Sequence, residues 1–329
     1  MLVSVIKQMF GRGRSMDERL AEWARTPYFD EDALGVRMRA KSEWLREQGY
    51  LDYPALVHVE TQAVCNAACN FCPYPNLERK GVRMSDALID KVIGDLADIP
   101  PSVPFQFAPY KVSDPFVEKR LFDILRAVNR RIPHARISMF TNGAALTERK
   151  IAALRGVANV AYLNVSLNFC DAGEYARVMG IPFERTLRRL DALHEAKSAG
   201  EFAPPVRLTR VSVDRPSDRA YLAWTKRRYP AFQPVVFPRN DWIGEIAGAG
   251  TASAVPDAPC HRWFDLSITS TGRVAMCCMD GEAKYPKGDV NTRHVLEIYN
   301  QPFLRELRSR LVSRREAAAP CNGCTYVSF

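Results

Sequence analysis

Three cysteines near the start of the sequence are spaced to hold a metal centre. Cys65, Cys69 and Cys72 lie close enough for one loop to bring three thiolates together. A mononuclear zinc site normally needs a fourth nearby ligand and paired two-residue spacings, which this group lacks. Three thiolates on a four-iron cubane leave one iron open to a substrate or cofactor. The spacing therefore favours a four-iron four-sulfur cluster with one open coordination site.

The composition is that of a globular protein with a sizeable core. The chain has 329 residues, 47% of them hydrophobic and 25% charged, which favours one main domain with a smaller addition. The net charge of +9 is spread in short groups such as 226–228, so nucleic acid is not an expected partner. The excess is compatible with an anionic small-molecule substrate, although a solvated basic surface explains most of it.

The first residues do not indicate a membrane protein. The apolar stretch 2–10 is too short to span a bilayer and lacks a small-residue cleavage site. Most of the nine cysteines fall into two groups, as metal ligands do, rather than in a pattern typical of secreted disulfide scaffolds. We therefore expect a cytoplasmic protein without a membrane partner.

Short apolar runs alternate with amphipathic stretches through the middle of the chain. A helical pattern over 17–49 comes first, and Ser85 is a candidate N-cap for the helix that follows the first strand. The expected strands are 56–60, 105–108, 136–140, 160–167, 206–213 and 234–237, and the expected helices are 87–96, 115–131, 147–154, 183–197 and 218–228. This alternation predicts a parallel sheet with right-handed crossovers, an α/β partial (β/α)6 barrel of the TIM type. Functional residues should then lie at the carboxyl ends of the strands, where the loop 65–72 falls.

The last part of the chain has a different pattern. The segment 244–259 is rich in Gly, Ala, Ser and Pro and is interpreted as a linker. Two short runs around Thr271-Gly272 predict a hairpin over 264–276, and 292–315 has a helical pattern.

The pattern Cys-x3-Cys-x-aromatic-Cys after the first strand of a partial barrel closely resembles the radical S-adenosylmethionine (radical SAM) superfamily. The resemblance covers about residues 55 to 324. The alternative interpretations of the three cysteines are a structural zinc knuckle or incidental buried cysteines. It implies that the open iron binds the amino and carboxylate groups of S-adenosylmethionine (AdoMet). It also implies reductive cleavage to a 5'-deoxyadenosyl radical that abstracts hydrogen from the substrate. Phe71 would lie beside the adenine, and an electron donor such as flavodoxin or ferredoxin would be a partner.

Other family positions map onto the ends of later strands. The family's Gly-Gly-Glu-Pro-like segment, which holds the methionyl amino group, is replaced by Lys-Val-Ser-Asp-Pro over 111–115. Either Asp114 stands in for the glutamate or backbone carbonyls do its work. The resemblance implies that Asn142, Ser166 and Asn168 contact the ribose or carboxylate of AdoMet. Arg210 on the fifth strand would pair with the carboxylate, because a guanidinium suits a bidentate contact.

The later cysteines resemble the C-terminal extension known as the twitch or SPASM domain, which holds an auxiliary cluster. The resemblance implies one auxiliary four-iron four-sulfur cluster on four thiolates, with structural zinc as the alternative. Neighbouring residues on a strand face opposite ways, so only one of Cys277 and Cys278 should be a ligand, and the Gly-x4-Cys spacing from Gly272 favours Cys277. The implied ligands are Cys260, Cys277, Cys321 and Cys324. The expected domains are a helical lead-in over 1–54, the barrel over 55–245 and a small α+β auxiliary-cluster domain over 246–329.

Three further side chains have two interpretations each. Cys170 follows the fourth strand, where some radical epimerases return a hydrogen atom from a cysteine, or it is a small buried hydrophobe. His58 and His261 are interpreted as structural residues rather than metal ligands.

The expected function is oxidation or epimerisation of a small polar molecule, such as a sugar or nucleoside intermediate. Peptide modification ranks lower because no winged helix for peptide recognition is evident. Sulfur insertion, with the auxiliary cluster as sulfur source, is a second enzymatic alternative. An iron-sulfur or zinc scaffold protein is the alternative without catalysis.

Overall fold

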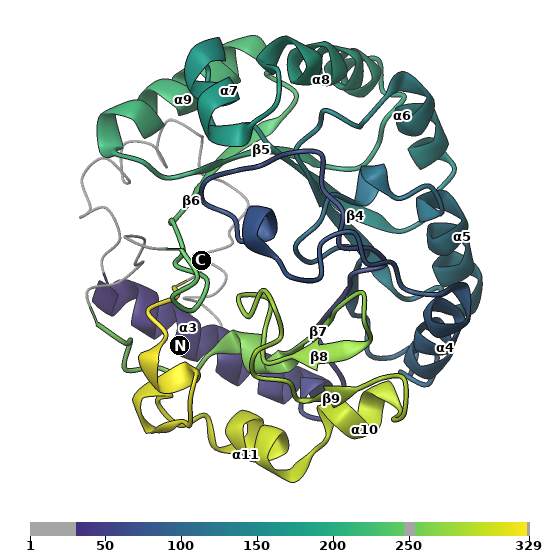
Figure 1. The fold of residues 1–329 in the computed structure, drawn as a ribbon, viewed down its shortest axis with the longest axis vertical. Helices are drawn as coiled ribbons and strands as arrows, with labels where there is room; N and C mark the ends of the chain where they lie inside the picture. The colour runs from purple at the N-terminus through teal and green to yellow at the C-terminus, as the bar shows by residue number, and fades with distance from the viewer. Residues whose placement is uncertain (1–30, 247–253, 328–329) are drawn as a thin grey trace.

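A computed structural model describes residues 31–246 and 254–327 and shows helices arranged around a curved, open sheet (Figure 1). Six parallel strands follow one another in chain order across the sheet. They are β1 (Leu56–Val59), β2 (Gln106–Ala108), β3 (Arg136–Thr141), β4 (Val160–Ser166), β5 (Val206–Val211) and β6 (Gln233–Phe237). The partial parallel barrel expected from the sequence is confirmed.

The crossover helices lie close to their predicted positions. They are α4 (Asp86–Leu96), α5 (Leu121–Arg131), α6 (Glu148–Arg155), α8 (Phe183–Ser198) and α9 (Arg215–Arg228). The Ser85 hydroxyl accepts a hydrogen bond from the Leu88 amide at 3.2 Å, as expected of an N-cap. The expected helix over 115–131 is a short 3-10 turn followed by α5. A further helix, α7 (Ala172–Met179), lies between β4 and α8 and was not predicted.

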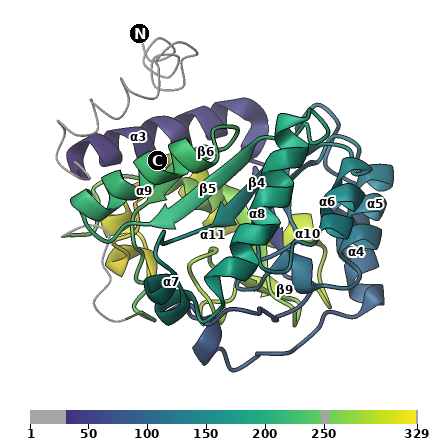
Figure 2. The same cartoon turned by 90° about the horizontal axis from the view of Figure 1, so that it is seen from above.

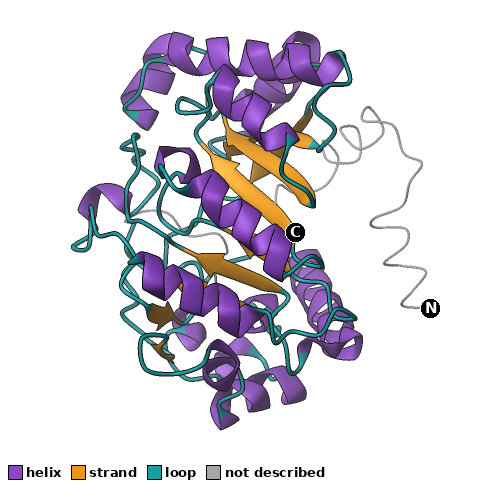
Figure 3. Cartoon of the chain, turned by 90° about the vertical axis from the view of Figure 1, so that its right-hand side faces the viewer, coloured by secondary structure: helices purple, strands orange, loops and turns teal. Residues whose placement is uncertain are grey.

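An alternation of side chains gives the barrel an apolar outside and a polar inside. Val57, Ile137 and Leu163 are fully buried and share one hydrophobic core with residues of the crossover helices. These helices cover the outer surface of the sheet (Figure 3). Full burial of one such side chain stabilises the fold by about 1.5–3 kcal/mol. Their strand neighbours, such as His58 and Asn164, point the other way because successive strand residues face opposite sides. These inward residues line a cavity.

The C-terminal strands extend the same sheet. Strand β7 (Asp265–Ile268) pairs in parallel with β1, and β8 (Arg273–Ala275) and β9 (Gly288–Asp289) add antiparallel strands. The sheet formed by the described residues therefore has nine strands. The predicted hairpin is confirmed, with Gly272 in its turn at a φ of 90° that favours glycine.

The remaining helices pack against these strands. The helical pattern expected over 292–315 contains α10 (Val295–Tyr299) and α11 (Pro302–Arg310), which are separate helices because Pro302 starts the second.

Helix α3 (Glu31–Leu45) is the described part of the predicted lead-in, and 17–30 lies outside the described residues. It runs along one side of the molecule (Figure 2). Its Met38 and Leu45 form a second buried core with Trp263 and Leu304 of the C-terminal segment. No helix in the described part of the chain is long and apolar enough to cross a membrane.

Candidate active site

A cavity of about 710 Å³ runs through the barrel. Cys65, Cys69 and Cys72 line it where the chain leaves the carboxyl end of β1. Lys41 and Trp44 of α3 line it together with residues at the amino ends of the strands. The volume lies within the range of about 300–1,000 Å³ that small-molecule sites occupy. The cavity therefore connects the predicted cluster loop with the opposite end of the barrel.

The cysteine loop is held in place by α7 and by the segment after β6. The amides of Ala68 and Asn70 donate to the carbonyls of Met179 and Val178 at 3.0 and 3.1 Å. The Trp242 indole N–H donates to the Phe71 carbonyl at 3.0 Å. The unpredicted helix α7 therefore helps to position the loop that carries the predicted cluster ligands.

The three thiols of this loop fit a metal cluster by their chemistry. They form no disulfide and are partly exposed. Burial raises the pKa of Cys65 to about 12 and that of Cys72 to about 11, so the thiolates need a bound cation to be stable. Among the residues described, no three Cys, His, Asp or Glu side chains lie close enough to hold a single metal ion. The ligands of a cubane lie further apart than those of one ion because its irons occupy different corners.

Asp114 organises the loops beside these cysteines. It is buried, and its Oδ2 accepts from the Thr141 hydroxyl and the Asn142 amide, both at 2.8 Å. Its Oδ1 accepts from the Phe116 amide at 2.9 Å. Three protein donors therefore already use the carboxylate that was predicted to stand in for the family glutamate. Asn142 also lines the cavity, with its Nδ2 3.8 Å from the Cys65 sulfur.

Ser166 and Arg210 line the cavity, whereas Asn168 does not. Asn168 Nδ2 donates to the Ser166 hydroxyl at 2.8 Å, and its Oδ1 accepts from the Val211 amide. Arg210 is buried, and its Nε donates to Asp218 Oδ1 at 2.7 Å. A carboxylate of AdoMet would therefore share this guanidinium with Asp218.

The thiols outside the cysteine loop separate into two environments. Burial raises the pKa of Cys277 well above its usual range, and the neighbouring thiols of Cys278, Cys324, Cys260 and Cys321 raise it further. Cys278 lines the cavity and Cys277 does not. Both follow the end of β8 at Ala275, in a bend and a turn, so the alternation expected of a strand does not apply to them and the choice of Cys277 as ligand stays a prediction. Cys170 does not line the cavity, and burial raises its pKa to about 11.

The predicted auxiliary ligands lie among donors suited to sulfur. The Trp263 indole N–H lies 3.5 Å from the Cys321 sulfur, and Arg314 Nη1 lies 3.7 Å from the Cys324 sulfur. Cys260, Cys321 and Cys324 are buried. N–H donors and burial are the features by which a protein tunes a cluster held by thiolates.

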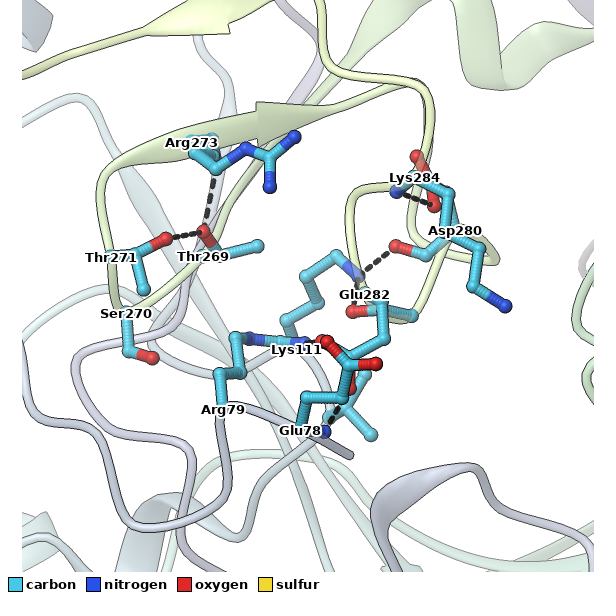
Figure 4. A network of polar contacts seen from close by, with 12 residues as sticks. Glu78, Arg79, Lys111, Thr269, Ser270, Thr271, Arg273, Asp280, Glu282 and Lys284 are labelled. Atoms are coloured by element: carbon cyan, nitrogen blue, oxygen red, sulfur yellow. Dashed lines mark hydrogen bonds and ion pairs between the residues drawn. The ribbon is translucent and has the colours of Figure 1, made fainter. Parts of the chain in front are cut away.

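Polar contacts tie the loop after Cys278 to the barrel (Figure 4). The buried Lys111 ammonium donates to the carbonyls of Asp280 and Gly281 at 2.6 and 3.1 Å. Arg79 Nη1 pairs with Glu282 at 3.0 Å. The two predicted cluster regions are therefore fixed relative to each other by charged groups.

The sequence interpretation missed several residues of the cavity wall. Arg136, Tyr162 and Arg207 line it at the amino ends of the strands, and Trp242 lines it after β6. The inward alternation along each strand was a usable signal for the first three. These three residues were not predicted because functional residues were expected at the carboxyl ends of the strands.

Comparisons with known proteins agree with this geometry. The family model "Radical SAM superfamily" matches residues 59–202, and a model described as "Iron-sulfur cluster-binding domain" (SPASM) matches 260–325. Together the two matches cover more than half of the chain. A comparison with curated protein sequences found no match.

Similar solved structures share the fold at low identity. BtrN in complex with AdoMet and 2-DOIA is 16% identical, with a TM-score of 0.60, covering 83% of this chain and 94% of BtrN. Streptococcus suis SuiB bound to precursor peptide SuiA is 13% identical, with a TM-score of 0.60, covering 81% of this chain and 69% of SuiB. The protein anSMEcpe with bound AdoMet is 12% identical, with a TM-score of 0.58, covering 82% of each chain.

These domains specify the cofactors. A radical SAM domain carries a four-iron four-sulfur cluster and binds AdoMet, and a SPASM domain carries auxiliary iron-sulfur clusters. The cysteines of both regions supply suitable ligands. The chain is therefore a radical SAM enzyme with a C-terminal SPASM-type iron-sulfur domain.

Proposed function

We propose that this enzyme oxidises a small, polar, hydroxylated molecule inside the barrel. The observation that carries the proposal is the cavity, which Cys65, Cys69 and Cys72 line together with Cys278 beside the auxiliary ligands. When bound, the cofactors supply the radical that abstracts hydrogen and an acceptor for the second electron. The chain's own residues bind the substrate between them and exclude bulk water.

The proposal gives each site residue a role. Cys65, Cys69 and Cys72 hold the catalytic cluster, and Cys260, Cys277, Cys321 and Cys324 hold the auxiliary one. Phe71, Asn142 and Ser166 contact AdoMet from the same end of the cavity. Asp114, Asn168 and Arg210 act as positioning residues through their hydrogen bonds to neighbouring residues. A flavodoxin or ferredoxin supplies the electron.

Two features support a small substrate. The cavity has the volume of a small-molecule site. The match to BtrN, whose structure contains 2-DOIA, covers 94% of that chain, whereas 69% of SuiB, which binds a peptide, is matched. Oxidation is favoured over epimerisation because Cys170, the candidate hydrogen donor, does not line the cavity.

The test is iron, sulfide and 5'-deoxyadenosine per chain after anaerobic reconstitution. Wild type should hold roughly eight irons, and the Cys65, Cys69, Cys72 triple alanine variant roughly four, with no nucleoside formed. Cys170→Ala is the matched control and should keep both the iron and the nucleoside. Intact clusters without AdoMet cleavage in wild type would instead indicate a scaffold protein.

Product mass separates the reactions once a substrate turns over. Oxidation removes two hydrogens, epimerisation leaves the mass unchanged, and sulfur insertion adds sulfur. A product that retains both hydrogens would overturn the oxidation proposal.

A further inference from the structure

Three cations in the cavity wall have no carboxylate partner. Lys41 of α3, Arg136 at the start of β3 and Arg207 of β5 line the cavity, and none forms an ion pair with a residue in 31–246 or 254–327. These cations are available to a ligand.

The other charged residues of the wall are already engaged. Lys111 donates to backbone carbonyls, Arg210 pairs with Asp218, and Arg262 pairs with Asp265 at 2.9 Å. Asp265 and Asp114 are the acidic side chains that line the cavity, and both accept protein hydrogen bonds. The uncommitted charge of the described wall is therefore positive.

The two arginines belong to one patch at the amino ends of the strands. Arg136 lies in register with Gln106 on β2, and the Tyr162 hydroxyl on β4 donates to Gln106 Oε1 at 2.8 Å. The Arg207 guanidinium lies 4.7 Å from the centre of the Tyr162 ring. Gln106 and Tyr162 therefore connect Arg136 to Arg207 across four neighbouring strands, β2 to β5, and each guanidinium can make a bidentate contact with an anion.

His58 adds a hydrogen-bond acceptor to the same cavity. Its Nδ1 lies 3.2 Å from the Tyr110 carbonyl, which can only accept, so Nδ1 carries the proton. Its Nε2 is buried and has no partner among the described residues. Burial lowers the pKa of His58 to about 3, so the ring is neutral and Nε2 presents a lone pair. A hydroxyl group of a ligand is a suitable donor to it.

The acceptor and the cations are spaced along the barrel axis. Leu56, two residues before His58, pairs with Gln106 on β2, and Gln106 pairs with Arg136 on β3. Two residues of a strand advance about 7 Å. A ligand that reaches both therefore has a hydroxyl and an anionic group separated by the length of a small sugar.

We propose that the amino-end half of the cavity binds a hydroxylated substrate with an anionic group, a phosphate or a carboxylate. Arg136 and Arg207 bind the anion, and His58 Nε2 accepts from a hydroxyl nearer to the cysteine loop. This inference rests on the proposed function and specifies the substrate class of the same site.

The test is anaerobic calorimetric titration of the reconstituted enzyme, with AdoMet present, using ribose, ribose 5-phosphate and gluconate as probes. Wild type should bind at least one anionic probe about tenfold or more tightly than ribose. The double variant Arg136→Gln/Arg207→Gln should lose this preference. The matched control Arg130→Gln/Arg149→Gln changes two exposed arginines outside the cavity and should keep it.

His58→Phe gives an independent readout. This substitution should weaken the binding of the anionic probe and the binding of ribose by a similar factor of about five, so that the ratio of the two affinities is preserved. Tighter binding of ribose 5-phosphate or of gluconate identifies the anion. Equal affinity for all three probes, no binding of any, or an equal loss in the control double variant would overturn the proposal.

The experiment distinguishes a failure of the anion site from a failure of the proposed function. If the same preparation cleaves AdoMet but does not distinguish the probes, the anion site is wrong and the radical chemistry stands. If it distinguishes the probes but forms no 5'-deoxyadenosine with both clusters loaded, the proposed oxidation is wrong and the anion site stands.

Discussion

Glu60→Gln should destabilise the enzyme strongly, because one buried carboxylate joins three segments. The Glu60 side chain is fully buried at the end of β1. Each of its oxygens accepts one bond from Arg79, at 3.0 Å. The Val112 amide donates to Oε1 at 2.9 Å and the Ser270 amide to Oε2 at 3.1 Å. These donors come from the loop after the cysteines, the segment after β2 and the C-terminal hairpin.

The size of the effect follows from this donor count. Glutamine offers one oxygen, so two of the four bonds are lost, and its amide group then faces two donors. Hydrogen bonds to a charged group contribute about 1.5–3 kcal/mol each, which gives about 3–6 kcal/mol in total. The entropy of unfolding is about 2.1 cal/mol/K per residue, so for a chain of this length Tm should fall by about 4–9 °C.

Thermal unfolding of the reconstituted enzyme under anaerobic conditions measures this shift. Glu282→Gln is the control, because Glu282 also pairs with Arg79 but is partly exposed and should shift Tm by less than about 2 °C. Adding Arg79→Met to Glu60→Gln should cost less than the sum of the two single changes, since both break the same bonds between Arg79 and Glu60. Equal shifts for Glu60→Gln and Glu282→Gln would refute the reasoning.

Three further predictions concern the site. Cys277→Ser should lower the iron content per chain and alter the auxiliary-cluster EPR signal, whereas Cys278→Ser should leave both unchanged; equal effects would contradict the choice of Cys277 as ligand. Trp242→Phe should weaken AdoMet binding about fivefold, because the hydrogen bond to the Phe71 carbonyl is lost, and an unchanged Kd would contradict this positioning role. Below pH 6.5 the unfolded chain gains a proton at His58 that the folded chain, with a pKa near 3, does not. Wild type should therefore lose up to about 1.4 kcal/mol per pH unit through this group between pH 6.5 and 5, and denaturant titrations of His58→Gln should lack that slope.

Features that depend on near neighbours in the chain were readable from the sequence. The Ser85 cap, the turn at Gly272 and the strand before the cysteine loop each involve residues a few positions apart. The alternation of strand and helix patterns was sufficient for the barrel because parallel strands require crossovers. Helix α7 follows β4 directly before α8, where the alternation of strands and helices leads one to expect a single crossover helix, and it is stabilised by the packing of Tyr175, Val178 and Met179.

The sequence by itself determined the chemistry: three closely spaced thiols after a strand, a barrel to hold them and a second cysteine group near the end. The tertiary structure decided which side chains share a space. It placed Cys278 rather than Cys170 in the cavity wall, and it paired β7 with β1. It also placed Lys41, Arg136 and Arg207, from three distant elements, in the wall of one cavity. Local patterns specify which way a side chain faces along its own strand or helix, whereas proximity between distant segments depends on the packing of the whole chain.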